Sequence, residues 1–289
     1  PTYGIKTAVS GKSAIDLLTQ MAAPDAEWAD FLPDIVDHIV EYHAEDIDKY
    51  KGMLEFDGKD FTPVSYTKPA IEDIIGQQDN VQRLGRLLYS FGEGNRIPNI
   101  VLRSRPGRGK TMSLRALADV HPDLRVVLIH HKYLNHLGTL IDKLAELPYQ
   151  VAAYVDDMHF GLGFDVEEFK TKTCGVKNDW PPNFALVVAV NPEAYDDLPE
   201  SMKARFGITL DYNKPFTLDE WKQIFEVTAR EVGVEYWDGL WNEFFKVHGK
   251  KPNDVTYLND QLSARVVRDF MIERKAINDV DFPPGLQRA

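Results

Sequence analysis

The stretch SRPGRGKT, residues 104–111, carries the residue types of a phosphate-binding loop. It ends in Gly109-Lys110-Thr111, as the pattern G-x-x-x-x-G-K-[ST] requires, but Ser104 stands where that pattern begins with Gly. A lysine ammonium at this place can neutralise β- and γ-phosphate oxygens, and the hydroxyl that follows can ligate Mg²⁺. We therefore predict a nucleotide site at this loop.

The flanking sequence favours a working loop. The apolar run before it predicts a buried strand and the residues after it a helix, whose first N–H groups and positive dipole end attract phosphate. Four residues supply the turn in which the backbone must approach the ligand: Pro106, Gly107, Arg108 and Gly109. Ser104 lies where the loop wraps phosphate least, and a small residue fits there at negative φ. The side chains of Arg105 and Arg108 either add charge beside the ligand or lie on a solvated surface.

A pair of carboxylates follows the apolar run VAAYV, residues 151–155. Acidic residues at the carboxyl edge of a parallel sheet are what a magnesium and water-activating site requires. We expect Asp156 to hold the metal and its water shell, and Asp157 to polarise an attacking water. In the alternative interpretation, the two acids only cap the helix that follows.

Two further polar residues come in a suggestive order. Asn191 ends another apolar run, where its amide can position water or a γ-phosphate. Arg205 follows in KARFG, just before a possible strand at Gly207–Tyr212. An arginine there can reach a neighbouring subunit's γ-phosphate and stabilise charge in the transition state. The alternative for Arg205 is an ordinary surface charge.

The elements that must position these residues form an alternating series. Nearly continuous apolar runs predict strands that are buried on both faces of a parallel sheet. These runs are Asn99–Ser104, Arg125–His130, Val151–Asp157 and Phe184–Asn191. Helical stretches such as Lys110–Val120 and Tyr133–Glu146 separate them. The pattern predicts an α/β fold with a parallel sheet between helices.

The two ends of the chain have a different pattern. Residues 1–65 are predicted to form an N-terminal helical extension and linker. The stretch with the linker pattern, Glu55–Ala70, overlaps the start of the next region. Its apolar stripe fits core packing or a docking surface: Phe31, Ile35, Ile39 and Tyr42. Residues 216–289 predict a helical lid whose first helix opens with Thr217 and Glu220, a capping pair. The nucleotide-binding core then spans residues 66–215.

The order of these motifs resembles that of the AAA+ ATPases. In that family the P-loop, VDD, strand-end Asn and ARFG correspond to Walker A, Walker B, sensor 1 and the arginine finger. LSARVVRDF resembles the sensor 2 segment of the lid, with Arg265 a better match than Arg268. IEDIIGQQDNVQRL resembles the entry segment of the family, in which Ile75 and Gly76 would contact adenine.

The closest resemblance is to a poorly characterised bacterial AAA+ group with an Asp-Asp Walker B, near the replication initiators and helicase loaders. It covers about residues 66–275. It implies an ATPase that uses ATP and Mg²⁺, assembles as a ring or helical filament, and remodels or loads a macromolecular partner. Asp157 replaces the more frequent Glu, so an ATP-gated switch or scaffold with very slow hydrolysis is the alternative. The motif order disfavours a third class, a small-molecule kinase.

The composition limits the kinds of partner and the cellular compartments that are expected for this protein. The net charge of −12 over 289 residues argues against a protein that coats DNA by charge alone, so a protein client is favoured over nucleic acid. Cys174 is the single cysteine, which excludes an internal disulfide and suits the cytoplasm. No apolar run approaches the roughly 20 residues that span a bilayer, and the first residues lack a secretory pattern. We expect a cytoplasmic protein without a membrane segment.

Overall fold

The computed structural model describes residues 52–56, 61–130, 133, 141, 149–158 and 181–278. The chain divides into two units, Pro1–Tyr50 and Lys51–Ala289, and every described residue lies in the second. The predicted N-terminal stripe, Cys174 and most of the helix predicted at Tyr133–Glu146 lie outside the described residues.

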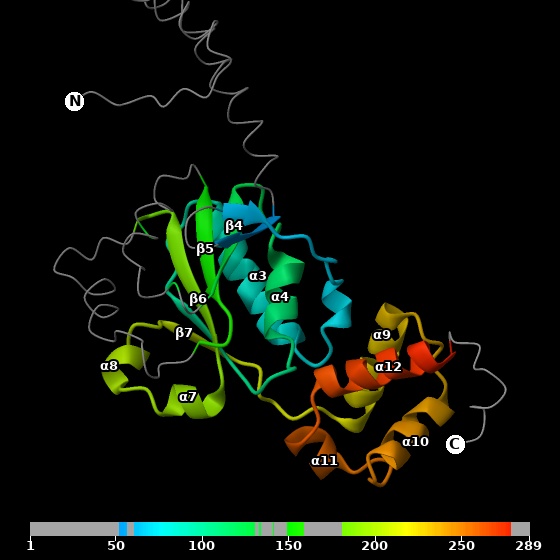
Figure 1. The fold of residues 1–289 in the computed structure, drawn as a ribbon. Helices are drawn as coiled ribbons and strands as arrows, with labels where there is room; N and C mark the ends of the chain where they lie inside the picture. Colours follow the sequence, from blue (N-terminus) through cyan, green and yellow to red (C-terminus); the bar gives the residue numbers. More distant parts are fainter. Residues whose placement is uncertain are drawn as a thin grey trace, which may run out of the picture. The chain divides into compact units, whose positions relative to one another are not determined.

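Seven strands form one sheet in the order β2-β1-β4-β5-β6-β3-β7 (Figure 1). The strands are β1 Gly52–Phe56, β2 Phe61–Pro63, β3 Ile100–Arg103, β4 Leu124–Ile129, β5 Gln150–Val155, β6 Phe184–Val190 and β7 Ile208–Asp211. All neighbouring pairs are parallel except β1 and β2. The four strands predicted from apolar runs and the possible strand at Gly207–Tyr212 are therefore confirmed, and so is the α/β class with a mostly parallel sheet.

The prediction of a linker at Glu55–Ala70 is wrong in its first half. β1 pairs in parallel with β4, and β2 pairs antiparallel with β1. Met53, Leu54 and Phe56 are buried in the sheet. Strands of five and three residues are too short to show a clear period, and Pro63 suits an edge strand, so the turn residues around them suggested a linker.

Both faces of the central strands are buried, as continuous apolar runs predict. Alternate residues such as Leu102, Val126 and Val187 pack with helices α3 (Gln78–Gly92) and α4 (Lys110–Leu117) in one core cluster. The intervening residues, such as Val101 and Val188, are also fully buried. This packing fixes the strands firmly, so the loops at their ends have a rigid support.

The C-terminal helices form a second apolar cluster that is rich in aromatic side chains. They are α9 Leu218–Val232, α10 Asp238–Val247, α11 Val255–Asp260 and α12 Ala264–Asn278. The predicted capping box at α9 is confirmed, because Thr217 accepts a hydrogen bond from the N–H of Glu220 and Glu220 returns one. The helical character predicted for residues 216–289 and the start of their first helix, α9, thus agree with the described structure, whereas the six-residue α11 was not predicted.

Three short helices complete the described elements: η1 Ile71–Asp73, α7 Pro192–Asp196 and α8 Glu200–Lys203. Within the part of the chain that the structure describes, no helix combines the length and the apolar character needed to cross a bilayer.

Candidate nucleotide site

Most of the predicted site residues meet at the carboxyl edge of the sheet. β3 leads into the loop before α4, β5 leads into Asp156 and Asp157, and β6 leads into Asn191. Because β3 and β5 both pair with β6 in parallel, these three strand ends lie side by side. A single hollow is lined by Pro106, Gly107, Arg108, Gly109, Lys110, Thr111, Met112, Asp156, Asp157, Asn191, Ala264 and Arg265.

The loop has the backbone shape that its glycines permit. Gly107 and Gly109 have φ of 74° and 93°, the left-handed region that other residues rarely adopt. Ser104 is fully buried and is not among the described non-glycine residues with positive φ. A serine therefore fits here without backbone strain, as the sequence analysis required of that position.

Lys110 turns back onto the first residues of its own loop. Its Nζ donates to the carbonyl oxygen of Ser104 at 2.7 Å and contacts the Ser104 hydroxyl at 2.9 Å, with the Arg105 carbonyl at 3.3 Å. Burial lowers the pKa of Lys110, while the nearby Asp156 and Asp157 raise it in part. The ammonium is thus partly desolvated. It is held by neutral oxygens, which an anionic phosphate would outcompete.

Thr111 and Asp156 join the loop to β5. The Thr111 hydroxyl donates to Asp156 Oδ2 at 2.9 Å, and the hydroxyl of Tyr154 donates to Asp156 Oδ1 at 2.8 Å. The two hydroxyl oxygens are 3.2 Å apart. Burial and then the negative charge of Asp156 raise the pKa of Tyr154 well above its ordinary value, so its phenol stays neutral.

Asp157 and Asn191 form the next pair along the edge. The Asn191 side-chain amide donates to Asp157 Oδ1 at 3.2 Å. Asp157 has φ of 51°, one of two described non-glycine residues in the left-handed region. Such a backbone conformation costs about 1–3 kcal/mol, so the surrounding packing must hold it in place. Residues of this kind cluster at functional sites.

The oxygen donors at this edge fit Mg²⁺. Thr111 offers a hydroxyl and Asp156 a carboxylate, both hard ligands of the kind that magnesium prefers. Among the described residues, no three His, Cys, Asp or Glu side chains form a metal cluster. A cation here would take its remaining ligands from phosphate and water. Mg²⁺ is commonly bound in this way and seldom by a cage made of protein ligands alone.

A second hollow adjoins the loop on the side of the C-terminal helices. Its mainly apolar lining includes Ile75, Met112 and Ile224, the surroundings that a flat base requires. Gly76 has φ of 71°, and a Cβ there would lie 2.8 Å from the ring of Phe216. Ile75 thus lines this hollow, whereas Gly76 lies against Phe216, just before α9, and is not among the lining residues.

The two candidate sensor arginines both belong to α12. Arg265 lines both hollows, whereas Arg268 lines only the second. This geometry favours Arg265 for contact with phosphate, in the order that the sequence analysis proposed.

The structure excludes one of the two interpretations of the side chain of Arg108, a residue that lines both hollows. It is only 4% exposed, so a solvated-surface position is wrong. Its guanidinium donates to the Asn259 carbonyl oxygen of α11 at 2.8 Å and lies 4.5 Å from the ring centre of Phe216. Burial, then the like charge of Arg105, lowers its pKa. Arg108 thus binds the loop to the C-terminal helices, and its backbone N–H stays in the turn.

Arg205 lies away from the other predicted residues. It precedes β7, whose first residue pairs with Ile100 at the start of β3, whereas the loop follows the end of β3 at Arg103. The strand between them spans roughly 10 Å, at ~3.3 Å per residue. Arg205 Nη1 donates to the Ser201 carbonyl at 2.8 Å, and its buried Nε has no hydrogen-bond partner in the described structure. Arg205 is not among the residues that line the hollow at the carboxyl edge.

Tyr154 is the site residue that the sequence analysis missed. It was counted as one more apolar residue in the run VAAYV. The available signal was a polar hydroxyl in a strand that is otherwise aliphatic, two residues before a carboxylate on the same strand face.

The contacts of Arg108 predict an uneven effect of the two loop arginines on stability. Arg108→Ala removes a buried charged hydrogen bond and an aromatic contact, so the free energy of unfolding should fall by about 2 kcal/mol. The matched change Arg105→Ala removes a side chain that is 45% exposed and 3.7 Å from Asp260, and should change it by less than about 0.5 kcal/mol. Urea titration followed by tryptophan fluorescence measures both, and equal losses would contradict the role of Arg108.

Comparisons with known proteins give limited likeness. Residues 53–193, just under half of the chain, match a family described as a protein of unknown function (DUF815). The RuvB Holliday junction branch migration motor of Thermotoga maritima matches with a TM-score of 0.48 and 22% identity over 74% of each chain. Two variants of that RuvB also match at 22% identity. For one variant the match covers 74% of each chain with a TM-score of 0.48, and for the other it covers 72% of each chain with a TM-score of 0.49. No curated protein matches the chain.

Proposed function

We propose that this chain is an AAA+-type ATPase that binds ATP with Mg²⁺ at the carboxyl edge of its sheet and hydrolyses it. One observation carries the proposal: the hydrogen bond from Thr111 to Asp156. It brings the loop hydroxyl and the strand-end carboxylate together beside Lys110, from positions 45 residues apart in the sequence. A chance G-K-T tripeptide has no reason to meet an acidic strand end in this way.

The residues at this edge divide the chemistry between them. Lys110 would exchange the oxygens of Ser104 for those of the β- and γ-phosphates, and Thr111 and Asp156 would hold the metal and its water. When bound, Mg²⁺ would neutralise charge on the phosphate oxygens. Asp157 would accept a proton from the attacking water, with its carboxylate oriented by Asn191.

The neighbouring helices complete the nucleotide site in this proposal. Ile75, which lines the second hollow, and its neighbour Gly76 would contact adenine, and Arg265 of α12, which lines both hollows, would reach the phosphates. Residues 66–215 would then act as the nucleotide-binding core and residues 216–289 as its lid. The Asp-Asp pair at 156–157 is the feature that would assign the chain to the poorly characterised bacterial group.

Assembly is the second part of the proposal. Arg205 would act in trans, at the nucleotide of a neighbouring copy, because it lies at the opposite end of β3 and β7 from its own loop. A contact between an arginine on one face and a nucleotide on another is heterologous, so it generates a ring or a helical filament.

An ATP-gated switch with very slow hydrolysis is the alternative function. The Asp157 carboxylate reaches about one bond less far than a glutamate, and Asn191 already occupies one of its oxygens at 3.2 Å. Turnover per subunit separates the two functions: stimulation on assembly supports a remodelling ATPase, and near-zero turnover with ATP-dependent oligomers supports the switch.

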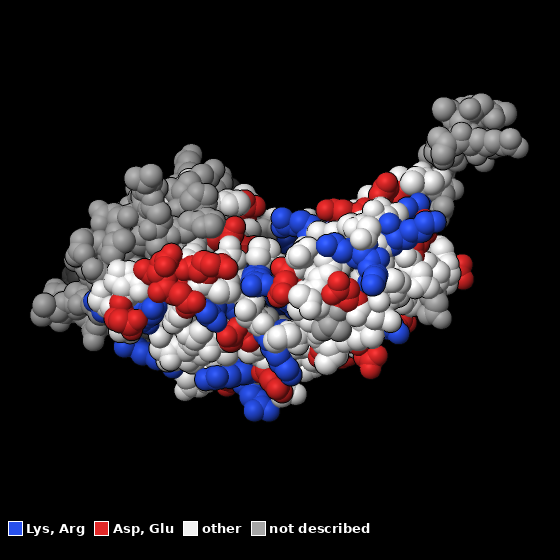
Figure 2. Space-filling model, turned by 90° about the horizontal axis from the view of Figure 1, so that it is seen from below, with Lys and Arg blue, Asp and Glu red and all other residues white. Residues whose placement is uncertain are grey.

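The client is proposed to be a protein of the cytoplasm. On the face shown in Figure 2, Lys and Arg side chains are interspersed with Asp and Glu. Together with the net charge of −12, this mixture does not suit binding to a phosphate backbone by charge alone.

The loop predicts the effect of removing its lysine. Lys110→Ala should lower affinity for ATP at least about 100-fold while the protein stays folded, because it removes the half-buried ammonium that we assign to the β- and γ-phosphates. Fluorescence titration with a labelled ATP measures the affinity. Lys222→Ala, on the exposed side of α9, is the matched control and should bind ATP normally. Unchanged affinity in folded Lys110→Ala protein would refute the site.

The position of Arg205 predicts complementation between subunits. Arg205→Ala should bind ATP nearly normally but hydrolyse it about 10³-fold more slowly, the usual effect of losing an arginine finger. Mixing it with Lys110→Ala subunits should restore part of the hydrolysis, because some junctions then join an intact pocket to an intact arginine.

A matched mixture controls for assembly alone. Arg205→Ala mixed with the double variant Lys110→Ala/Arg205→Ala should stay inactive, since no subunit then supplies the arginine. Absence of recovery in the first mixture, with mixed oligomers demonstrated, would contradict action in trans.

A further inference from the structure

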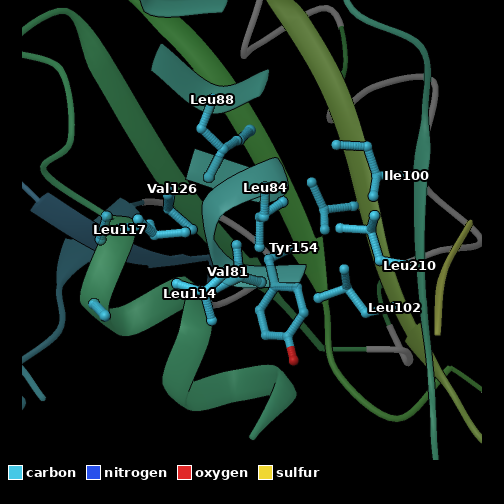
Figure 3. Packing of buried hydrophobic residues seen from close by; sticks show 14 of the residues in the cluster. Val81, Leu84, Leu88, Ile100, Leu102, Leu114, Leu117, Val126, Tyr154 and Leu210 are labelled. Carbon is cyan, nitrogen blue, oxygen red and sulfur yellow. The ribbon is translucent and has the colours of Figure 1, made fainter. Parts of the chain in front are cut away.

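A buried tyrosine hydroxyl lies behind the two residues that we assign to the metal. Tyr154 is on β5 and is fully buried in the core cluster between the sheet and helices α3 and α4. Figure 3 shows its ring among Val81, Leu84 and Leu114, with the hydroxyl at the end of the ring that points away from Leu84. The ring therefore belongs to the core, and its hydroxyl extends beyond it.

The hydroxyl ends at the metal ligands. It donates to Asp156 Oδ1 at 2.8 Å, while Thr111 donates to Asp156 Oδ2 at 2.9 Å. Each carboxylate oxygen thus has one donor from the protein, and each keeps a lone pair for a cation or its water. With both oxygens bound, the carboxylate plane cannot rotate freely about its last bond.

Packing makes this arrangement rigid. Tyr154 is anchored by a ring buried in a close-packed core, so its hydroxyl cannot follow Asp156 if the carboxylate moves. Asp156 itself is only partly buried, and it follows the last residue of β5. Its orientation would otherwise depend on the single bond from Thr111.

We propose that Tyr154 is a positioning residue that orients the Asp156 carboxylate, and through it Thr111, for the divalent cation bound with the nucleotide. This inference rests on the proposed ATP site. A packing role alone would require only the ring, which phenylalanine supplies equally well. The hydroxyl acts as the outer-shell partner of a metal ligand, and loss of such a partner typically weakens metal affinity 10–100-fold.

The test compares nucleotide affinity with and without the cation. Calorimetry would measure binding of the non-hydrolysable analogue AMP-PNP to the full chain, in Mg²⁺ and in EDTA. Tyr154→Phe should lose about tenfold or more of the affinity in Mg²⁺ and almost none in EDTA. The same variant should broaden or shift the electron paramagnetic resonance signal of Mn²⁺ bound with AMP-PNP, because its ligand geometry changes.

A matched tyrosine separates this role from packing. Tyr212 is fully buried in the same cluster, and burial raises its pKa to about 12, but in the described structure its hydroxyl makes no hydrogen bond to Asp156 or Thr111. Tyr212→Phe removes a buried hydroxyl of the same kind. It should leave the effect of Mg²⁺ on affinity unchanged.

A double variant tests whether Tyr154 acts through the carboxylate. In the Asp156→Asn background, Tyr154→Phe should cause no further loss of affinity in Mg²⁺, since the two residues act as one unit. If Tyr154→Phe does not fold, Tyr154→Met fills the ring space with an apolar chain and should show the same loss.

The outcomes distinguish the inference from the function on which it rests. If the wild-type chain does not bind AMP-PNP, the proposed ATP site is refuted. If the wild-type chain binds with Mg²⁺ dependence and Tyr154→Phe keeps that dependence, the role of Tyr154 is refuted. Equal losses in Mg²⁺ and EDTA would also refute it, because they would mean that the hydroxyl only stabilises the fold.

Discussion

The hydrogen bond between Thr111 and Asp156 is the contact on which the whole site depends. It joins the start of α4 to the end of β5, two elements between which strand β4 lies in the sequence. The contact forms only because β3, β5 and β6 run parallel and end at one edge, each held by a core that is buried on both faces. Rigid strands thus deliver a hydroxyl, a carboxylate and an ammonium to one place.

The same edge of the sheet holds a partly buried charge and a strained backbone conformation. The Lys110 ammonium is partly buried and hydrogen-bonded to neutral oxygens of Ser104. Asp157 has a left-handed backbone conformation. A phosphate would compensate the cost of desolvating the ammonium, because it replaces neutral dipoles by a full opposite charge. Arg108 connects this loop to the C-terminal helices, so a change in the loop on binding would reach them through a buried contact.

Much of this was predictable from the sequence, because strands buried on both faces read as continuous apolar runs and a phosphate loop has a distinctive end. The short strands β1 and β2 and the short helix α11 were not, since three to six residues give no clear period. The contacts of Arg108 could not be predicted either, because its aromatic and carbonyl partners lie more than 100 residues away. Tyr154 was hidden by its apolar surroundings.

The measurement that tests the central claim most directly is a crystal structure of the full chain with AMP-PNP and Mg²⁺. The account predicts that the triphosphate lies on the loop, that Lys110 Nζ has left the oxygens of Ser104 for the β- and γ-phosphates, and that Thr111 and Asp156 face the metal. A triphosphate bound elsewhere, or bound here with Lys110 still on Ser104, would contradict it.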